Sequence, residues 1–381
     1  MARTLKSDKT LFLATLLLVG ASVVMVYSAS AVQSMDKGQT PFYFLLKQLA
    51  WVAIGLVLML SAMRVDYHAY RQPRLIWSLL GVTVAGLVAA FLLPKVANTH
   101  RWVSLGFVSL QPSELAKLAA IFFTAAILER RAHRINDIGY AMLPIGVMTV
   151  VLATLIYKEP DFGTTAVLVL VVTALVFSAG LSYRYLIGTG LVLLPTGVAM
   201  ILLSGYRTER LMAFLDRDKY ALTGAFQLNQ SLIALGSGGT LGTGLMAGVQ
   251  KLFYIPDPHT DFIYAVIGEE LGLIGTTVIL IAFLVIAWRG LRTALVAADR
   301  FGAFLALGIT TMVACQALVN MSVVIGMFPT KGIPLPFVSN GGSSLVINMV
   351  AMGILLNISQ QGSANAAAAI GTTTAGELVS A

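Results

Sequence analysis

The sequence predicts an all-α integral membrane protein with about ten transmembrane helices. Of its 381 residues, 57% are hydrophobic and only 11% are charged, whereas roughly 25% of the residues of a soluble domain are charged. Apolar runs of a length suited to a bilayer recur along almost the whole chain. Short clusters of Lys and Arg flank these runs. The net charge of +8 therefore indicates membrane topology and not nucleic-acid binding.

The first apolar run, Leu11–Tyr27, follows Lys6 and Lys9 and precedes the small residues Ser28 to Ala31. This order resembles a signal peptide with its cleavage site. The run is longer than a usual signal-peptide core and further spans follow it, so we expect an uncleaved first helix.

Nine further apolar runs complete the expected ten spans. They are Phe42–Met63, Leu75–Leu93, Ser113–Glu129, Ala141–Tyr157, Thr164–Leu181, Tyr185–Leu203, Phe262–Trp288, Phe301–Phe328 and Gly341–Ile358. The run that begins at Phe262 is longer than the hydrocarbon core requires. Its first turns are expected to project from the bilayer or to lean over a cavity.

Basic residues are distributed unevenly between the alternate loops. One side carries Arg3, Lys6, Lys9, Arg64, Arg71, Arg74, Arg130, Arg131, Arg134, Arg184, Arg289, Arg292 and Arg300. The short loops of the other side hold Lys37, Lys95, Arg101, Lys158 and Lys331. The richer side is cytoplasmic by the positive-inside rule. Both termini are then cytoplasmic, and the long loop between spans seven and eight, about residues 204–261, lies outside.

That long loop is expected to be functional, because it is too long for a simple connection. Residues 227–235 are compatible with a short amphipathic helix at the membrane interface. The glycines at 236, 238, 239, 242 and 244 follow no strand, which argues against a dinucleotide-binding motif. Close approach of their backbone to a phosphate and a flexible turn both stay open. Residues 1–359 are predicted to form one polytopic catalytic domain, and residues 360–381 a disordered cytoplasmic tail.

The stretch Pro256–Gly272 joins the loop to the eighth span, and it carries His259, Asp261, Glu269 and Glu270. A carboxylate in hydrocarbon costs about 2.5–3.5 kcal/mol on insertion scales, so these acids are expected to face a protein interior or a wet cavity. Asp261 also suits the first turn of a helix, where it would complement the helix dipole. Both readings stay open on the residues alone.

Other polar residues gather on the same predicted outer face. Glu114 fits the first turn of a helix, and Lys117, inside an apolar run, needs a partner that Glu114 could supply at i−3. Asp161 could simply start the sixth span, and Trp102 could be an interfacial aromatic. Together with Arg101, Arg207, Arg210, Lys331 and Asn340, these residues favour an anionic, lipid-linked substrate handled outside. Composition alone fits a transporter equally well.

Several motifs in this order resemble the SEDS family (shape, elongation, division and sporulation) of bacterial cell-wall proteins, which includes the FtsW and RodA proteins. The matching stretches are RWVSLGFVSLQPSELAK, EPDFGTT, YRTERLMAFLD, QSLIALGSGGTLGTGL, HTDFIYAVIGEELGLIG and PTKGIPLPFVSNGGSSL. PTKG at 329–332, with GSGG and GEELG, favours the FtsW branch. Asn340 departs from the aromatic that the family usually has there, and Asp257-Pro258 replaces the commoner Glu-Ala or Glu-Pro.

The resemblance implies a SEDS-type bundle that acts as an inverting peptidoglycan glycosyltransferase. It would polymerise lipid II into β-1,4-linked glycan on the outer face of the cytoplasmic (inner) membrane during septal synthesis. Implied partners are a class B penicillin-binding transpeptidase, other divisome proteins and membrane lipid, with no nucleic acid. The alternatives are a lipid II transporter (flippase), a non-catalytic scaffold that activates the transpeptidase, and a RodA-like role in elongation.

The resemblance also assigns roles to the candidate residues. Asp261 matches the essential acid of the family and would be the general base. The candidate substrate-binding residues are Arg101, Trp102, Arg207, Arg210, His259, Lys331 and Ser343, and the expected cavity charge network is Glu114, Lys117, Asp161 and Glu269. Neutralisation of the departing pyrophosphate falls to Arg101, Arg207, Arg210, Lys331 or a divalent cation, Mg²⁺ or Mn²⁺.

Overall fold

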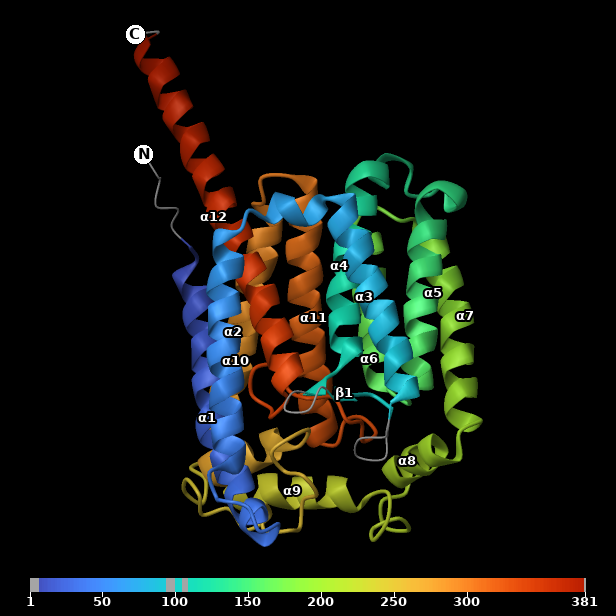
Figure 1. The fold of residues 1–381 in the computed structure, drawn as a ribbon, viewed down its shortest axis with the longest axis vertical. Helices are drawn as coiled ribbons and strands as arrows, with labels where there is room; N and C mark the ends of the chain where they lie inside the picture. The colour runs from blue at the N-terminus through green and yellow to red at the C-terminus, as the bar shows by residue number, and fades with distance from the viewer. Residues whose placement is uncertain (1–6, 94–99, 105–108, 380–381) are drawn as a thin grey trace.

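A computed structural model describes residues 7–93, 100–104 and 109–379 of the chain. Ten long helices of these described ranges stand side by side in one bundle (Figure 1). They are α1 (Lys9–Asp36), α2 (Tyr43–Arg64), α3 (Pro73–Leu92), α4 (Pro112–Arg131), α5 (Leu143–Lys158), α6 (Phe162–Ser178), α7 (Tyr183–Leu202), α10 (Ile263–Leu295), α11 (Arg300–Val324) and α12 (Gly342–Val379).

Each of the ten helices covers one of the ten expected spans. Eight of them, within the described residues, are long and apolar enough to cross a membrane. The other two are α6, with 17 residues, and α4, which carries the buried charges Glu114 and Lys117. The predicted fold class is confirmed.

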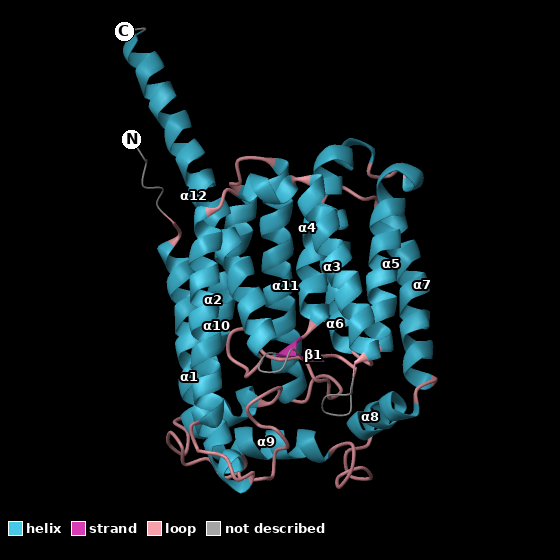
Figure 2. Cartoon of the chain, viewed as in Figure 1, coloured by secondary structure: helices cyan, strands magenta, loops and turns pink. Residues whose placement is uncertain are grey.

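Shorter elements lie at the two ends of the bundle. Helices α8 (Gly205–Leu215) and α9 (Phe226–Gly238) lie across one end, at the bottom of Figure 1, and α1 begins at the other end. Figure 2 shows that most loops gather at these two ends. Strand β1 (Val103–Ser104) pairs antiparallel with β2 (Ser109–Leu110). Helical turns at Tyr67–Arg71, Ala132–Arg134 and Ile138–Met142 connect the helices at the opposite end.

Two segments outside the ten spans were given expectations: residues 227–235 and the tail from residue 360. The predicted helix at residues 227–235 is confirmed by α9, whereas α8 was not foreseen. Helix α12 continues to Val379 and projects from the bundle (Figure 1), and the disorder expected from residue 360 stays a prediction. The alanine-rich sequence suits a helix there, because Ala has the highest intrinsic helix propensity.

Burial differs sharply between the helices. In an 18-residue stretch of the span Gly342–Gly362, which belongs to α12, 78% of the residues are buried. In the corresponding stretch of α7, 0% are buried. An apolar groove of about 490 Å³ lies between α6 and α7, and its walls include Phe162, Val169, Leu193 and Met200. Helix α7 therefore packs loosely beside α6 at the edge of the bundle.

Helix α10 is broken at Gly272, whose φ of 64° is left-handed. The break leaves backbone groups without helical partners, and the glycine-rich segment after α9 binds them. Thr243 and Gly244 donate their N–H groups to the carbonyls of Glu269 and Glu270. In return, Leu273 and Ile274 donate to the carbonyls of Gly239 and Thr240.

The glycines permit this contact because a side chain would not fit. A Cβ atom on Gly238 would lie 1.9 Å from the carbonyl oxygen of Gly268, and one on Gly242 would lie 2.1 Å from that of Glu270. Close packing against α10 thus explains these glycines, a reading that the sequence did not suggest.

Both glutamates of α10 also hold the segment through their side chains. Glu269 accepts hydrogen bonds from the N–H groups of Val249 and Gln250. Glu270 is fully buried and accepts from Ser28 of α1 and, at 2.6 Å, from Lys251. The small residues after the first apolar run, including Ser28, are therefore part of the packed helix α1.

Substitution of Gly238 by Ala should weaken this packing and leave the rest of α9 intact. The new methyl group must displace backbone, so we expect a loss of about 2 kcal/mol or more and a lower apparent Tm in detergent. Gly236→Ala in the same helix is the matched control, since nothing lies within 4 Å of its Cβ position, and it should leave Tm unchanged or slightly higher. Equal melting temperatures for the two variants would contradict the close contact.

Candidate active site

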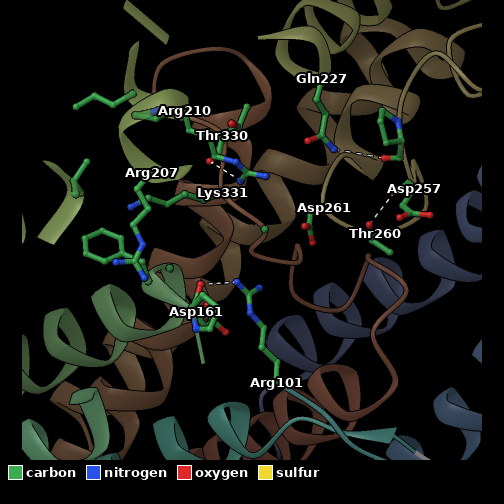
Figure 3. Close-up of a pocket in the computed structure, with 18 residues that line it drawn as sticks. Arg101, Asp161, Arg207, Arg210, Gln227, Asp257, Thr260, Asp261, Thr330 and Lys331 are labelled. Atoms are coloured by element: carbon green, nitrogen blue, oxygen red, sulfur yellow. Dashed lines mark hydrogen bonds between the residues drawn. The ribbon is translucent and has the colours of Figure 1, made fainter. Parts of the chain in front are cut away.

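A cavity of about 430 Å³ opens at the α8–α9 end of the bundle. Its polar side chains come from six separate parts of the chain (Figure 3): Arg101, Asp161, Arg207, Arg210, Gln227, Asp257, Thr260, Asp261, Thr330 and Lys331. The cavity therefore gathers half of the twelve candidate residues at the end of the bundle that the charge pattern predicts to lie outside.

Asp261 lies just before α10 and faces the cavity (Figure 3). Its backbone carbonyl accepts a hydrogen bond from Asn320, but its carboxylate accepts none from the described part of the chain. Burial raises the pKa of Asp261 to about 6, against the opposing charge of Arg101 and with help from Asp161. Asp261 is therefore an available carboxylate, mostly ionised at pH 7, that binds protons more strongly than usual.

Arg101 stands beside this carboxylate and is held by backbone. Its Nε and Nη2 atoms donate to the carbonyls of Glu159 and Pro160, at 3.1 and 2.6 Å. Gly332 completes the wall, because a Cβ atom there would lie 2.7 Å from Asp261 Oδ2 and 4.0 Å from Arg101 Nη1. Glycine at this position thus leaves room for the catalytic candidate.

Three further cations line the cavity: Arg207, Arg210 and Lys331. The Arg207 guanidinium lies 4.2 Å from the centre of the Tyr157 ring, and Lys331 Nζ lies 4.1 Å from that of Phe162. Burial, together with the charge of Arg207, lowers the pKa of Lys331 to about 8. Arg210 donates to the carbonyl of Thr330. These groups make a site for an anion.

Asp161 serves both roles that the sequence left open. It caps α6, since its carboxylate accepts from the N–H and the hydroxyl of Thr164. The same carboxylate lines the cavity and accepts from Gln111. The cap therefore fixes a negative charge close to Arg101.

A second cavity, of about 260 Å³, adjoins the first. It is lined by Arg101, Trp102, Gln111, Thr260, Asp261, Gly332, Pro334, Asn340, Gly341 and Ser344. Trp102 and Asn340 reach this smaller cavity and do not line the larger one.

The predicted pairing of Lys117 with Glu114 is confirmed. The two side chains are buried and 2.8 Å apart. Lys117 also donates to Gln316, and Ser344 donates to Glu114. This network holds α4, α11 and α12 together; Ser344 lines the smaller cavity, whereas Glu114, Lys117 and Gln316 line neither cavity.

Three candidate residues lie away from the lining of both cavities. His259 is buried against Phe44, with ring centroids 4.4 Å apart, and burial lowers its pKa to about 4. Ser343 is buried and accepts from the backbone N–H of Gln111. Glu269 binds the segment after α9, as described above. These three residues support the site and do not line it.

Glu159, whose backbone carbonyl holds Arg101, is a buried acid beside the site that the sequence reasoning missed. It is fully buried, neither carboxylate oxygen has a hydrogen-bond partner in the described part of the chain, and burial and Asp161 raise its pKa to about 8. The sequence signal is a pair of acids two positions apart at a helix end, in KEPD, of which the sequence analysis assigns a role only to Asp161.

The described residues contain no cluster of three or more His, Cys, Asp or Glu side chains placed to hold a metal ion. The carboxylates that line the larger cavity are those of Asp161, Asp257 and Asp261. Mg²⁺ commonly binds through one or two carboxylates together with phosphate oxygens of a substrate. These carboxylates fit a cation that arrives with such a ligand.

The chain is similar to proteins of one family along almost its whole length. A family model described as "Cell cycle protein", which covers FtsW, RodA and SpoVE proteins, matches residues 9–364. A "Probable peptidoglycan glycosyltransferase FtsW" of Trichlorobacter lovleyi is 42% identical over 364 residues, 94% of each chain. "Stage V sporulation protein E" of Bacillus subtilis is 40% identical and covers 93% of this chain and 97% of its own.

Two solved structures share the fold. A chain in "Structural coordination of polymerization and crosslinking by a peptidoglycan synthase complex" is 27% identical, with a TM-score of 0.77, over 94% of this chain and 99% of that chain. The Rod shape determining protein RodA of Thermus thermophilus is 24% identical, with a TM-score of 0.68, over 93% and 97%.

Substitution of Asp261 by Asn should stabilise the folded protein at neutral pH. The folded-state pKa of about 6 lies above the ordinary 3.8, so the ionised carboxylate opposes folding, increasingly from about pH 4 to pH 6 and fully above it. The variant should therefore gain about 1–3 kcal/mol at pH 7.5, seen as a higher apparent Tm, and the gain should vanish near pH 4. Asp218→Asn, on the exposed part of the same loop, should show no such gain. A less stable Asp261→Asn protein at pH 7.5 would contradict the desolvated state of this carboxylate.

Proposed function

Because the chain belongs to the FtsW, RodA and SpoVE family of cell cycle proteins, we propose that it is a peptidoglycan glycosyltransferase that polymerises lipid II, with Asp261 as the general base. The names of its close relatives support the enzymatic activity. The observation that carries the catalytic assignment is the carboxylate of Asp261, which faces the cavity without a hydrogen-bond partner in the described part of the chain.

The reaction joins two lipid-linked disaccharide units. Asp261 takes the proton from the 4-hydroxyl of the acceptor sugar while that oxygen attacks C1 of the donor. The bond from C1 to the pyrophosphate oxygen breaks, and its electron pair leaves on undecaprenyl pyrophosphate. An α-linked donor becomes a β-linked glycan, so one displacement with inversion suffices. General-base catalysis contributes about 10²–10⁴-fold.

The departing pyrophosphate needs positive charge, which is the second requirement of the reaction. Arg101, Arg207, Arg210 and Lys331 line the cavity and are the proposed groups. A divalent cation stays part of the proposal. Asp161 or Asp257 would hold it together with the phosphate oxygens, and it would neutralise charge on the leaving group.

An apolar route for the lipid tail supports a lipid-linked substrate. Phe162 lines both the larger cavity and the groove between α6 and α7. The groove is lined almost entirely by apolar side chains and faces the predicted hydrocarbon region. We assign it to the polyprenyl tail of a substrate whose head group occupies the cavity.

The multi-pass chain is proposed to lie in the cytoplasmic (inner) membrane, with both termini inside and the cavities outside. The relatives named FtsW favour a role in division over a RodA-like role in elongation. The fold shared with a chain of a complex that performs polymerisation and crosslinking supports a penicillin-binding transpeptidase as partner.

The decisive experiment is polymerisation of purified lipid II by the full-length protein, with and without its transpeptidase. Wild type should make long glycan, and Asp261→Asn should lose at least about 100-fold in rate, because the base is removed while the fold is kept. Asp218→Asn is the control for the loss of a loop carboxylate.

The outcomes separate the alternatives. Equal rates for wild type and Asp261→Asn would remove Asp261 from the mechanism and direct attention to Glu159 or Asp161. No polymerisation by wild type, even with the partner, would favour the transporter or the scaffold. A scaffold also predicts that Asp261→Asn supports growth normally.

The rate should depend on pH through two groups of the cavity. Below about pH 6 Asp261 is protonated and cannot act as a base, and above about pH 8 Lys331 loses its charge. We expect a bell-shaped profile of kcat/KM with limbs near these values. Lys331→Arg should remove the alkaline limb and keep the acid limb, since arginine stays charged. An alkaline limb that is unchanged in this variant would exclude Lys331 as its cause.

A further inference from the structure

Asp261 lies at the junction of the two cavities. Four residues belong to the walls of both: Arg101, Thr260, Asp261 and Gly332. The larger cavity, of about 430 Å³, and the smaller one, of about 260 Å³, therefore approach the same carboxylate from two sides. A base that takes a proton from one bound substrate while that substrate attacks the other needs this kind of placement.

The two cavities differ in charge. Arg207, Arg210 and Lys331 line only the larger one. Beyond the shared residues, the smaller one is lined by groups without charge: Trp102, Gln111, Pro334, Asn340, Gly341 and Ser344. The larger cavity suits an anion and the smaller one suits a neutral, hydroxyl-rich ligand.

The two substrates differ in the same way at the atoms that react. The donor reacts at the carbon that carries its pyrophosphate, so its reacting end is strongly anionic. The acceptor reacts at the 4-hydroxyl of its terminal N-acetylglucosamine, which is neutral, and its own pyrophosphate lies one sugar further away. We propose that the larger cavity binds the donor pyrophosphate and that the smaller cavity binds the terminal sugar of the acceptor. This assignment rests on the proposed function.

Two side chains of the smaller cavity would recognise the sugar. Trp102 supplies a flat apolar ring on which the C–H face of a pyranose can lie, and an N–H donor. The side-chain amide of Asn340 makes no hydrogen bond within the described residues, while its backbone N–H is fixed by the carbonyl of His259 at 2.9 Å. An amide on a fixed backbone, free to bind, suits the hydroxyl and acetamido groups of the sugar.

The remaining walls are held rigidly. The side-chain amide of Gln111 donates to Ser113 and Asp161, both at 3.1 Å. Arg101 is tied to the carbonyls of Glu159 and Pro160, and so stands at the boundary between the cavities. A sugar hydroxyl bound in the smaller cavity would lie next to Asp261. A phosphate bound in the larger cavity would lie next to Arg207, Arg210 and Lys331. The proton passes to Asp261, and the electron pair of the broken C1–O bond leaves with the pyrophosphate.

Binding of two probes tests the division without relying on turnover. One probe is undecaprenyl pyrophosphate, which carries the leaving group. The other is the phosphate-free disaccharide of N-acetylglucosamine and N-acetylmuramic acid, at millimolar concentration. Each stabilises the full-length protein in detergent by an amount that reports its Kd, measured as a ligand-induced shift in Tm.

The variants should separate the two probes. Trp102→Ala and Asn340→Ala should weaken disaccharide binding at least fivefold and change undecaprenyl pyrophosphate binding less than twofold. Arg207→Gln should do the reverse. Trp102→Phe, which keeps a flat ring, should restore most of the disaccharide affinity. Trp77→Ala, which removes an exposed tryptophan of α3, is the matched control and should alter neither affinity.

Two results would overturn the proposal: disaccharide binding that is unaffected by both Trp102→Ala and Asn340→Ala, or loss of both probes together in every variant, as in a single shared site. Polymerisation of lipid II by wild type is measured in parallel. Its failure would reject the proposed function, whereas active protein with probes that do not separate would reject only the two subsites.

Discussion

The break in α10 at Gly272 is the constraint on which the geometry of the site depends. An uninterrupted helix would bond its own backbone groups, and the glycine-rich segment after α9 would have no ladder on which to dock. With the break, carbonyls and N–H groups of both partners are satisfied, and Glu269 and Glu270 add side-chain bonds. The chain that leaves this docked segment leads directly to Asp261. Irregular backbone in a membrane protein is tolerated where it is buried in protein or lies beside a cavity, as it is here.

The site combines two opposed electrostatic demands within one cavity system. A base must hold protons more strongly than an ordinary carboxylate, and a leaving group needs nearby cations, which weaken that hold. Burial dominates at Asp261, whose pKa is raised, while Arg101 opposes it. Two of the cations lie against aromatic rings: Arg207 over Tyr157 and Lys331 over Phe162. Attraction to the ring faces holds these charges in place without neutralising them by a carboxylate.

Much of this architecture is readable from the residues, and the remainder depends on contacts between distant segments. The ten spans follow from hydropathy, the Glu114–Lys117 pair from i, i+3 spacing, and the candidates Arg101, Asp161, Arg207, Lys331 and Asp261 from charge placed beside apolar runs. Sequence spacing could not show that Glu269 turns away from the cavities, because its carboxylate is held by the N–H groups of Val249 and Gln250, which lie in another segment of the chain. It also could not pair Lys251 with Glu270 or find the packing role of Gly238, since each depends on a tertiary contact. Helix α8 was missed because it is short and only weakly apolar.

The buried bridge between Lys251 and Glu270 has a consequence for how the protein is built. Lys251 precedes Glu270 by 19 residues, and Ser28, their shared partner, belongs to α1. A ribosome therefore delivers the first helix, then the lysine, and the glutamate last. When the turn of α10 that carries Glu270 enters the membrane, Lys251 and Ser28 have already been synthesised. The carboxylate of Glu270 therefore need not stay unpaired in hydrocarbon. The order of synthesis thus matches the order in which the charges must be accommodated.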